Sequence, residues 1–293
     1  MDMRGGGWAV QQSEKSTSLW EKLQEIDVRY IYLLVWIVVS IPILKPLGLP
    51  LGSISEETML LYDFIDHLPP RSIVVMIADQ GPAAATECQP GMVAIFRHCV
   101  EKDLRVLFFA SRTEAVPFIE QCMIDVLGAS KDHPDYGKLY VNLGFIPQYE
   151  IGLSALAANI FYTTTDAYGN SLKSMEFFKD LPTGTAKDWS LAIYFGNSNV
   201  DWVVRQVNDP YGCPVAGGVG AVLVSRIYPY YPQQVIGFLT GLRGSAEYEV
   251  LVGKPGSAVA GMDAQSLAHL AIIIMIIIGN IGYFVSKRRI GGF

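Results

Sequence analysis

Two apolar stretches, residues 28–44 and 267–285, lie near the ends of the chain. The first has 17 residues, and a helix of that length spans about 25 Å, the lower limit for crossing a bilayer. The second holds eleven Leu, Ile, Phe or Val residues, which outweigh His269 and Asn280 near its ends. Both stretches are therefore predicted to be transmembrane helices.

Between these stretches, short apolar runs alternate with segments of helical periodicity. The runs at 72–78, 105–110, 139–145 and 191–195 are predicted to be buried strands. Helices are predicted at 56–67, 92–101, 114–127, 153–162 and 200–207. Strands that alternate with helices imply βαβ units, so residues 50–263 are predicted to form a Rossmann-like α/β domain, with a mostly parallel sheet flanked by helices.

The last part of this domain has a less regular pattern. Residues 217–224 (GGVGAVLV) fit either a fifth strand or a tight start to a helix. Residues 233–248 are predicted to form a helix that leads back towards the membrane. Residues 253–261 (GKPGSAVAG) are rich in small residues and are predicted to be a flexible linker to the second span.

The composition supports attachment to a membrane. Hydrophobic residues make up 51% of the chain and charged residues 17%, against about 25% charged in typical soluble domains. The net charge is −6, and an acidic chain does not fit a nucleic-acid binder, which would carry a basic patch. Lipid is thus the expected partner, and nucleic acid is not.

Flanking charges predict the orientation of the spans. Basic residues precede the first span and follow the second, whereas residues 50–263 hold 14 Lys plus Arg against 23 Asp plus Glu, a balance of −9. The positive-inside rule places residues 1–27 and the basic tail 286–293 in the cytoplasm and the domain outside it, in the cell (inner) membrane. Lys45 alone opposes this orientation.

The segment before the first span is expected to hold an interfacial helix. Ser18-Leu19-Trp20-Glu21 resembles a capping box, and Trp20 suits the headgroup layer. A frayed polar tail is the alternative. No small-x-small cleavage site follows the first span, so an uncleaved signal anchor is favoured over a signal peptide.

Polar residues follow the predicted strands, where ligands bind in open parallel sheets. Asp79 follows the first strand, Arg112 the second and Asn197 the fourth. Asp79 suits a metal, a ribose or a cationic ligand, and Arg112 suits a carboxylate or phosphate. The alternative is that both side chains cap helices and pair with each other.

Two further sites are candidates for a ligand. Gly218, in Gly217-Gly218-Val219-Gly220, either lets backbone N–H groups approach an anion or allows close packing. Asp166, in the polar segment 163–170, either binds a ligand or forms Asx turns. The four histidines are scattered and no cofactor motif is present, so no metal and no cofactor are expected.

Four cysteines fall in the predicted domain, without a Cys-x-x-Cys pair. An extracytoplasmic domain allows one or two disulfides but does not require them. Cys99 and Cys122 lie on apolar helix faces and are expected to be buried thiols.

Several segments look familiar: 140–145 (YVNLGF), 165–169 (TDAYG), 214–219 (PVAGGV), 228–231 (YPYY) and 241–249 (GLRGSAEYE). They resemble a widespread, uncharacterised bacterial family of two-span membrane proteins with an intervening α/β domain. The resemblance covers nearly the whole chain beyond residue 28. It implies the same architecture and assigns no activity, ligand or catalytic residue.

Three functions fit these observations. The first is a homo-oligomeric assembly or scaffold, because Gly279 and Gly282 allow close helix approach and Asn280 seeks an interhelical partner. The second is a membrane-tethered domain that binds or senses a small-molecule ligand. The third is an envelope hydrolase or transferase with Asp79 or Asp166 as acid or base.

Overall fold

The computed structural model describes residues 27–290, which form two compact units. One unit comprises residues 42–264, and the other contains residues 27–41 and 265–290. The predicted interfacial helix before residue 27 lies outside the described residues, as does the end of the predicted tail.

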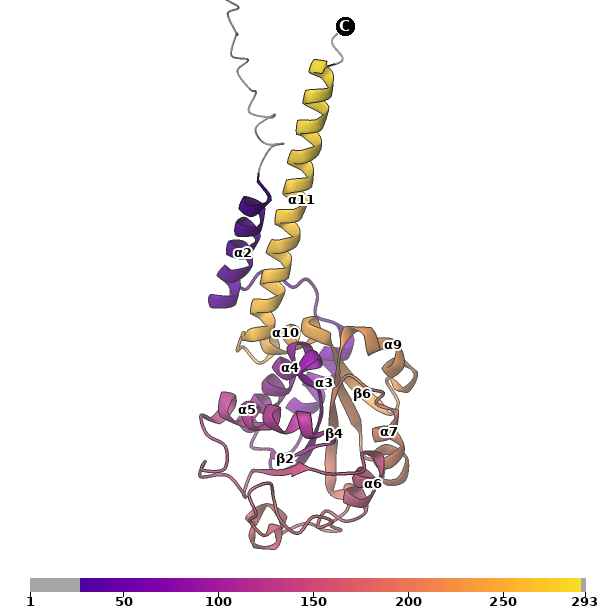
Figure 1. Ribbon diagram of the computed structural model, residues 1–293. Helices are drawn as coiled ribbons and strands as arrows, with labels where there is room; N and C mark the ends of the chain where they lie inside the picture. The colour runs from indigo at the N-terminus through magenta and orange to yellow at the C-terminus, as the bar shows by residue number, and fades with distance from the viewer. Residues whose placement is uncertain (1–26, 291–293) are drawn as a thin grey trace, which may run out of the picture. The chain divides into compact units, whose positions relative to one another are not determined.

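The unit of residues 42–264 contains one sheet of six parallel strands, in the order β3-β2-β1-β4-β5-β6 (Figure 1). The strands are β1 (Ile73–Asp79), β2 (Arg105–Ala110), β3 (Tyr140–Phe145), β4 (Trp189–Gly196), β5 (Val215–Val219) and β6 (Val235–Thr240). The predicted Rossmann-like fold is thereby confirmed. All seven residues of β1 are buried, as expected for a central strand covered on both faces.

Helices cover both faces of the sheet. Alternate residues of each strand enter two cores, so Val74 and Met76 pack with one set of helices while Val75 and Ile77 pack with the other. On the first face lie α3 (Glu56–Asp66), α4 (Pro82–Glu101), α5 (Val116–Leu127) and α10 (Gly241–Leu251). On the second lie α6 (Glu150–Ala158), α7 (Asp201–Val203) with the π-helical turn that follows it, and α9 (Val224–Ile227).

The prediction of one helix over residues 233–248 is wrong. This segment contains β6, which pairs with β5, followed by α10. Most residues of Val235–Thr240 are buried, with α3 on one face of the strand and the core under α6, α7 and α9 on the other. Pairing with β5 provides hydrogen-bond partners for its backbone N–H and C=O groups. Residues 217–224 likewise divide into the end of β5 and two short helical turns.

The predicted flexible linker at 253–261 is also wrong, because helix α11 (Ser257–Ile290) begins inside it. The buried carboxylate of Glu249 accepts hydrogen bonds from the backbone N–H groups of Gly256, Ala258 and Val259. These N–H groups have no partner within the helix, so a side chain on α10 caps the start of α11.

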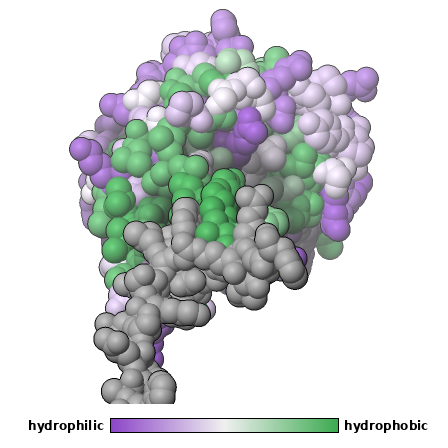
Figure 2. Space-filling model, turned by 90° about the horizontal axis from the view of Figure 1, so that it is seen from above, coloured by the Kyte–Doolittle hydropathy of each residue, from purple (hydrophilic) through white to green (hydrophobic). Residues whose placement is uncertain are grey.

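Two described helices are strongly apolar. Residues Ser257–Val285 of α11 are long and apolar enough to cross a membrane, whereas α2 (Val28–Leu44) is apolar but shorter. Most large apolar side chains of both helices are exposed. In the view of Figure 2, hydrophobic residues gather towards the middle and hydrophilic residues around the rim.

A second buried carboxylate links the two ends of the α/β unit. Asp263, in the second turn of α11, is 1% exposed. It accepts hydrogen bonds from the backbone N–H groups of Leu47, Gly48 and Leu49, at 2.7 to 2.9 Å. The segment that follows α2 is thus fixed to the start of α11.

Candidate functional site

Asp79 is the last residue of β1, at the point where the strand order reverses between β1 and β4. Connections leave these two neighbouring strands in opposite directions, which opens a crevice beyond their carboxyl ends in doubly wound folds. The Asp79 side chain is fully buried. A buried carboxylate is stable only with hydrogen-bond or charge partners, and these partners define the site.

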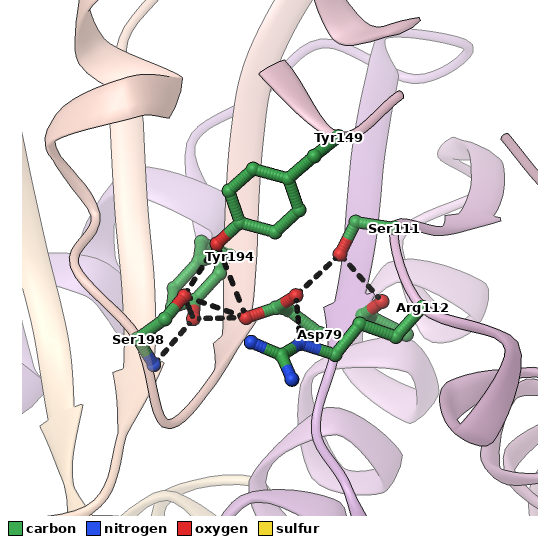
Figure 3. A network of polar contacts seen from close by, with 7 residues as sticks. Asp79, Ser111, Arg112, Tyr149, Tyr194 and Ser198 are labelled. Carbon is green, nitrogen blue, oxygen red and sulfur yellow. Dashed lines mark hydrogen bonds and ion pairs between the residues drawn. The ribbon is translucent and has the colours of Figure 1, made fainter. Parts of the chain in front are cut away.

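Five side chains donate hydrogen bonds to the Asp79 carboxylate (Figure 3), and four of them lie within 2.9 Å of it. Its Oδ1 atom accepts from Ser111 Oγ at 2.6 Å and from Arg112 Nε at 2.9 Å. Its Oδ2 atom accepts from the Tyr194 hydroxyl and from Ser198 Oγ, both at 2.7 Å. These donors come from the ends of β2 and β4, so the parallel sheet brings them together.

Tyr149 completes the cluster from a strained turn. Its hydroxyl donates to Asp79 Oδ2 at 3.5 Å and lies 2.5 Å from Ser198 Oγ. Its ring lies over Trp202, with the ring centroids 4.3 Å apart. Gln148 and Tyr149 both have positive φ, 69° and 49°. Residues other than glycine rarely adopt this backbone conformation, because it costs on the order of 1 to 3 kcal/mol. It persists where the contacts around the residue enforce it.

Protonation in the cluster follows from burial and charge. Burial raises the pKa of both Tyr194 and Tyr149, so these hydroxyls remain protonated and available as donors. The charge of Asp79 raises the pKa of Arg112, which therefore stays cationic. The cluster thus surrounds Asp79 with a guanidinium and neutral tyrosine hydroxyls at neutral pH.

The geometry suits binding more directly than chemistry at Asp79. The Oδ1 atom already accepts two hydrogen bonds from the chain and Oδ2 accepts three, so Asp79 positions its neighbours. Arg112 is 49% exposed and can also contact a ligand; arginine binds carboxylate and phosphate groups in a bidentate manner. Within residues 27–290, no cluster of three or more His, Cys, Asp or Glu side chains could hold a metal ion.

The predicted residue Asn197 points elsewhere. Its Oδ1 atom lies beside Gly220 in the turn after β5, within 2.8 Å of where a β-carbon on Gly220 would be. Ser198 occupies the place expected for Asn197. The cavities of about 300 to 490 Å³ found in the described part of the domain are lined by residues other than Asp79, Arg112 and Asn197.

Gly218 packs within the domain. A β-carbon on this residue would lie 2.6 Å from Cδ1 of Phe195, so the glycine allows β4 and β5 side chains to pack closely. This contact is the close packing given as one of the two alternatives for Gly218.

Asp166 organises its own loop. Its carboxylate accepts from the backbone N–H groups of Tyr168 and Asn170, from the Asn170 amide and from the Tyr136 hydroxyl. These contacts are the Asx-type turn contacts given above as the alternative to a ligand site.

Sequence reasoning missed two of the five partners of Asp79, Tyr149 and Tyr194. Ser111, Arg112 and Ser198 follow predicted strands, and the ends of these strands are expected to converge. Tyr194 lies inside β4 and Tyr149 follows a loop, and no local pattern distinguishes either residue. The four cysteines are free, buried thiols in the structure.

The fold and the site together define a Rossmann-like α/β domain with a polar cluster at its switch point, on a chain with one helix of membrane-spanning length. No family model, curated protein or solved structure matches the chain. The function is therefore inferred from the geometry of the site.

Proposed function

We propose that this protein is a membrane-anchored binding protein, whose α/β domain takes up a small ligand with a carboxylate or phosphate group beyond the carboxyl ends of β1 and β4. The Asp79 cluster carries the proposal. Side chains from three separate segments converge on one buried carboxylate at the switch point, and they hold a half-exposed arginine beside it.

The energetics of the cluster support a functional role. Asp79 is buried but Arg112 is half exposed, and neither exposed nor buried ion pairs add much to stability on balance, so this pair is poor evidence for a purely stabilising role. The two positive-φ residues before α6 add backbone strain at the same place. Strain that serves to place Tyr149 against Ser198 is typical of preorganised binding sites.

The anchor in this proposal consists of two spans, α2 and α11. Support comes from the apolar exposed surface of both helices and from the basic residues that flank them in the sequence. Both termini are then cytoplasmic and the domain is extracytoplasmic, in the cell membrane. The resemblance to two-span membrane proteins with an α/β domain agrees with this arrangement.

The binding proposal is tested with the full chain in lipid nanodiscs and three anionic probes: inorganic phosphate, succinate and AMP. We expect at least one probe to bind in calorimetry with millimolar or better affinity. The substitution Arg112→Gln removes the bidentate donor and should weaken that binding at least tenfold.

The matched control is Arg71→Gln. Arg71 is also partly exposed and pairs with a carboxylate, that of Glu176, but it precedes β1 at the opposite end of the strand. This variant should bind as the unmodified chain does. Equal binding by the Arg112→Gln variant, or no binding of any probe, would refute the proposed site.

A second candidate function is the homo-oligomeric scaffold. Asn280 is exposed within the apolar part of α11, and a β-carbon on Gly279 would meet no atom within 4 Å. Gly282, in contrast, is already buried within the chain. A polar side chain that faces lipid is stabilised by a hydrogen bond to a neighbouring helix. Native mass spectrometry in mild detergent should therefore show assemblies of more than one chain. The Asn280→Leu variant should form assemblies with fewer chains.

A further inference from the structure

Two adjoining cavities lie beside the first turns of α11, away from the Asp79 cluster. The larger, about 490 Å³, is a mainly apolar groove between α4, α10 and α11, and it includes Ala85, Leu242 and Gly261. The smaller, about 300 Å³, includes the charged residues Arg97, Asp125 and Glu249. Gln89, Pro90 and Ser257 line both cavities, so an elongated molecule can occupy the two together.

The charged cavity offers one cation and one anion to a ligand. Among the described residues Arg97 forms no hydrogen bond or ion pair, although its side chain is half-buried. The Glu249 carboxylate accepts hydrogen bonds from the backbone N–H groups of Gly256, just before α11, and of Ala258 and Val259 in its first turn. Asp125 is exposed and accepts one hydrogen bond, from Gln121, so its charge remains available.

The order of the two cavities along α11 matches the orientation of a lipid. Gly256, which lines only the charged cavity, precedes the predicted hydrocarbon span at Leu267 by eleven residues. Gly261, which lines only the apolar groove, precedes it by six. These separations are about 16 and 9 Å along a helix. The charged part is therefore the more distant from the hydrocarbon, and the apolar groove is the nearer. Lipids of the leaflet have the same order, with the head group outside and the acyl chains inside.

We propose that these cavities form one site for a phospholipid with an amino head group. The phosphate binds the Arg97 guanidinium, the ammonium group binds the Asp125 carboxylate, and an acyl chain lies in the groove beside Leu242 and Gly261. The paired charges of the cavity favour a zwitterionic head group over an anionic one. The inference depends on the proposed anchorage by α11 but not on the Asp79 site.

The test uses the full chain, purified in mild detergent, delipidated and titrated with one amphiphile at a time. The probes are phosphatidylethanolamine, phosphatidylglycerol and oleate, and native mass spectrometry counts the molecules bound. We expect one phosphatidylethanolamine per chain, bound at least tenfold more tightly than phosphatidylglycerol or oleate. Free fatty acid and bilayer lipid are thereby distinguished.

Three substitutions separate the parts of the site. Arg97→Gln should weaken phosphatidylethanolamine binding at least tenfold, and Asp125→Asn should abolish its preference over phosphatidylglycerol. Thr86→Trp places an indole in the groove from an exposed position on α4, so it should weaken both lipids without disturbing the core. The controls Glu101→Gln and Glu101→Trp, at the exposed end of the same helix, should bind as the unmodified chain does.

The inference is overturned by equal binding of the two lipids, by tighter binding of oleate, by unchanged binding in the Arg97→Gln and Thr86→Trp variants, or by association of two chains through this groove without lipid. Failure of the chain to insert into vesicles would instead refute the anchorage. Anion binding at Arg112 should be unaffected by Arg97→Gln, so the two sites are tested independently.

Discussion

The substitution Asp79→Asn tests whether the carboxylate organises the switch-point cluster. It keeps the shape of the side chain, removes its charge and replaces one acceptor oxygen by an NH₂ donor. Each Asp79 oxygen accepts from two side chains at 2.6 to 2.9 Å, and Oδ2 also accepts from Tyr149 at 3.5 Å. The new NH₂ group therefore faces two close donors at either position. The change therefore removes two hydrogen bonds to a buried charge.

The expected cost follows from these lost contacts. A hydrogen bond to a charged group contributes about 1.5 to 3 kcal/mol, so losing two would cost about 3 to 6 kcal/mol. Hydroxyl groups can rotate and accept from the new NH₂, which recovers part of this loss. The ion pair adds less than about 1 kcal/mol, because Arg112 is half exposed. We expect the free energy of unfolding to fall by about 3 kcal/mol.

Thermal unfolding of the full chain in nanodiscs measures this loss. For a unit the size of residues 42–264, about 3 kcal/mol corresponds to a decrease in Tm of about 6 to 12 °C. The control Asp180→Asn removes an exposed carboxylate that lies 3.8 Å from Arg105 and should change Tm by less than about 2 °C. An unchanged or raised Tm for Asp79→Asn would show that the carboxylate does not organise the cluster.

Three further outcomes are expected. Gly218→Ala should lower the free energy of unfolding by about 1 to 3 kcal/mol in denaturant titration, because the new methyl group overlaps the Phe195 ring; a neutral effect would contradict the packing role. Burial lowers the pKa of His98 below its usual 6.5, so the unfolded chain binds a proton at a higher pH than the folded chain does. Stability should therefore fall as the pH decreases from about 6.5, and His98→Gln should reduce this loss between pH 7 and 5. An unaltered pH dependence of stability in this variant would contradict the role of His98. Protease added outside cells with a permeabilised outer layer should cut within residues 50–263 and spare both tails, whereas digestion of the tails alone would reverse the proposed topology.

Local sequence pattern alone determined the two apolar helices and most of the sheet. The runs at Ile73–Asp79 and Arg105–Ala110 are continuous and apolar because both faces of a parallel sheet are covered, and this signal needs no knowledge of the partners. The position of Asp79 and Arg112 at the ends of neighbouring strands followed from the same pattern. Their pairing was one of the two alternatives that the sequence left open.

Tertiary structure decided what no local pattern specifies. Residues 233–248 divide into β6 and α10 because the edge of the sheet offers β5 as a partner, and α11 begins at Ser257 because Glu249 caps it. The remaining partners of the site come from distant segments: Tyr149 and Tyr194 are 70 and 115 residues from Asp79. Sequence periodicity shows which residues share a face of one helix or strand. The hydrogen bonds to a buried charge depend instead on how the strands assemble, so only the folded sheet brings this cluster together.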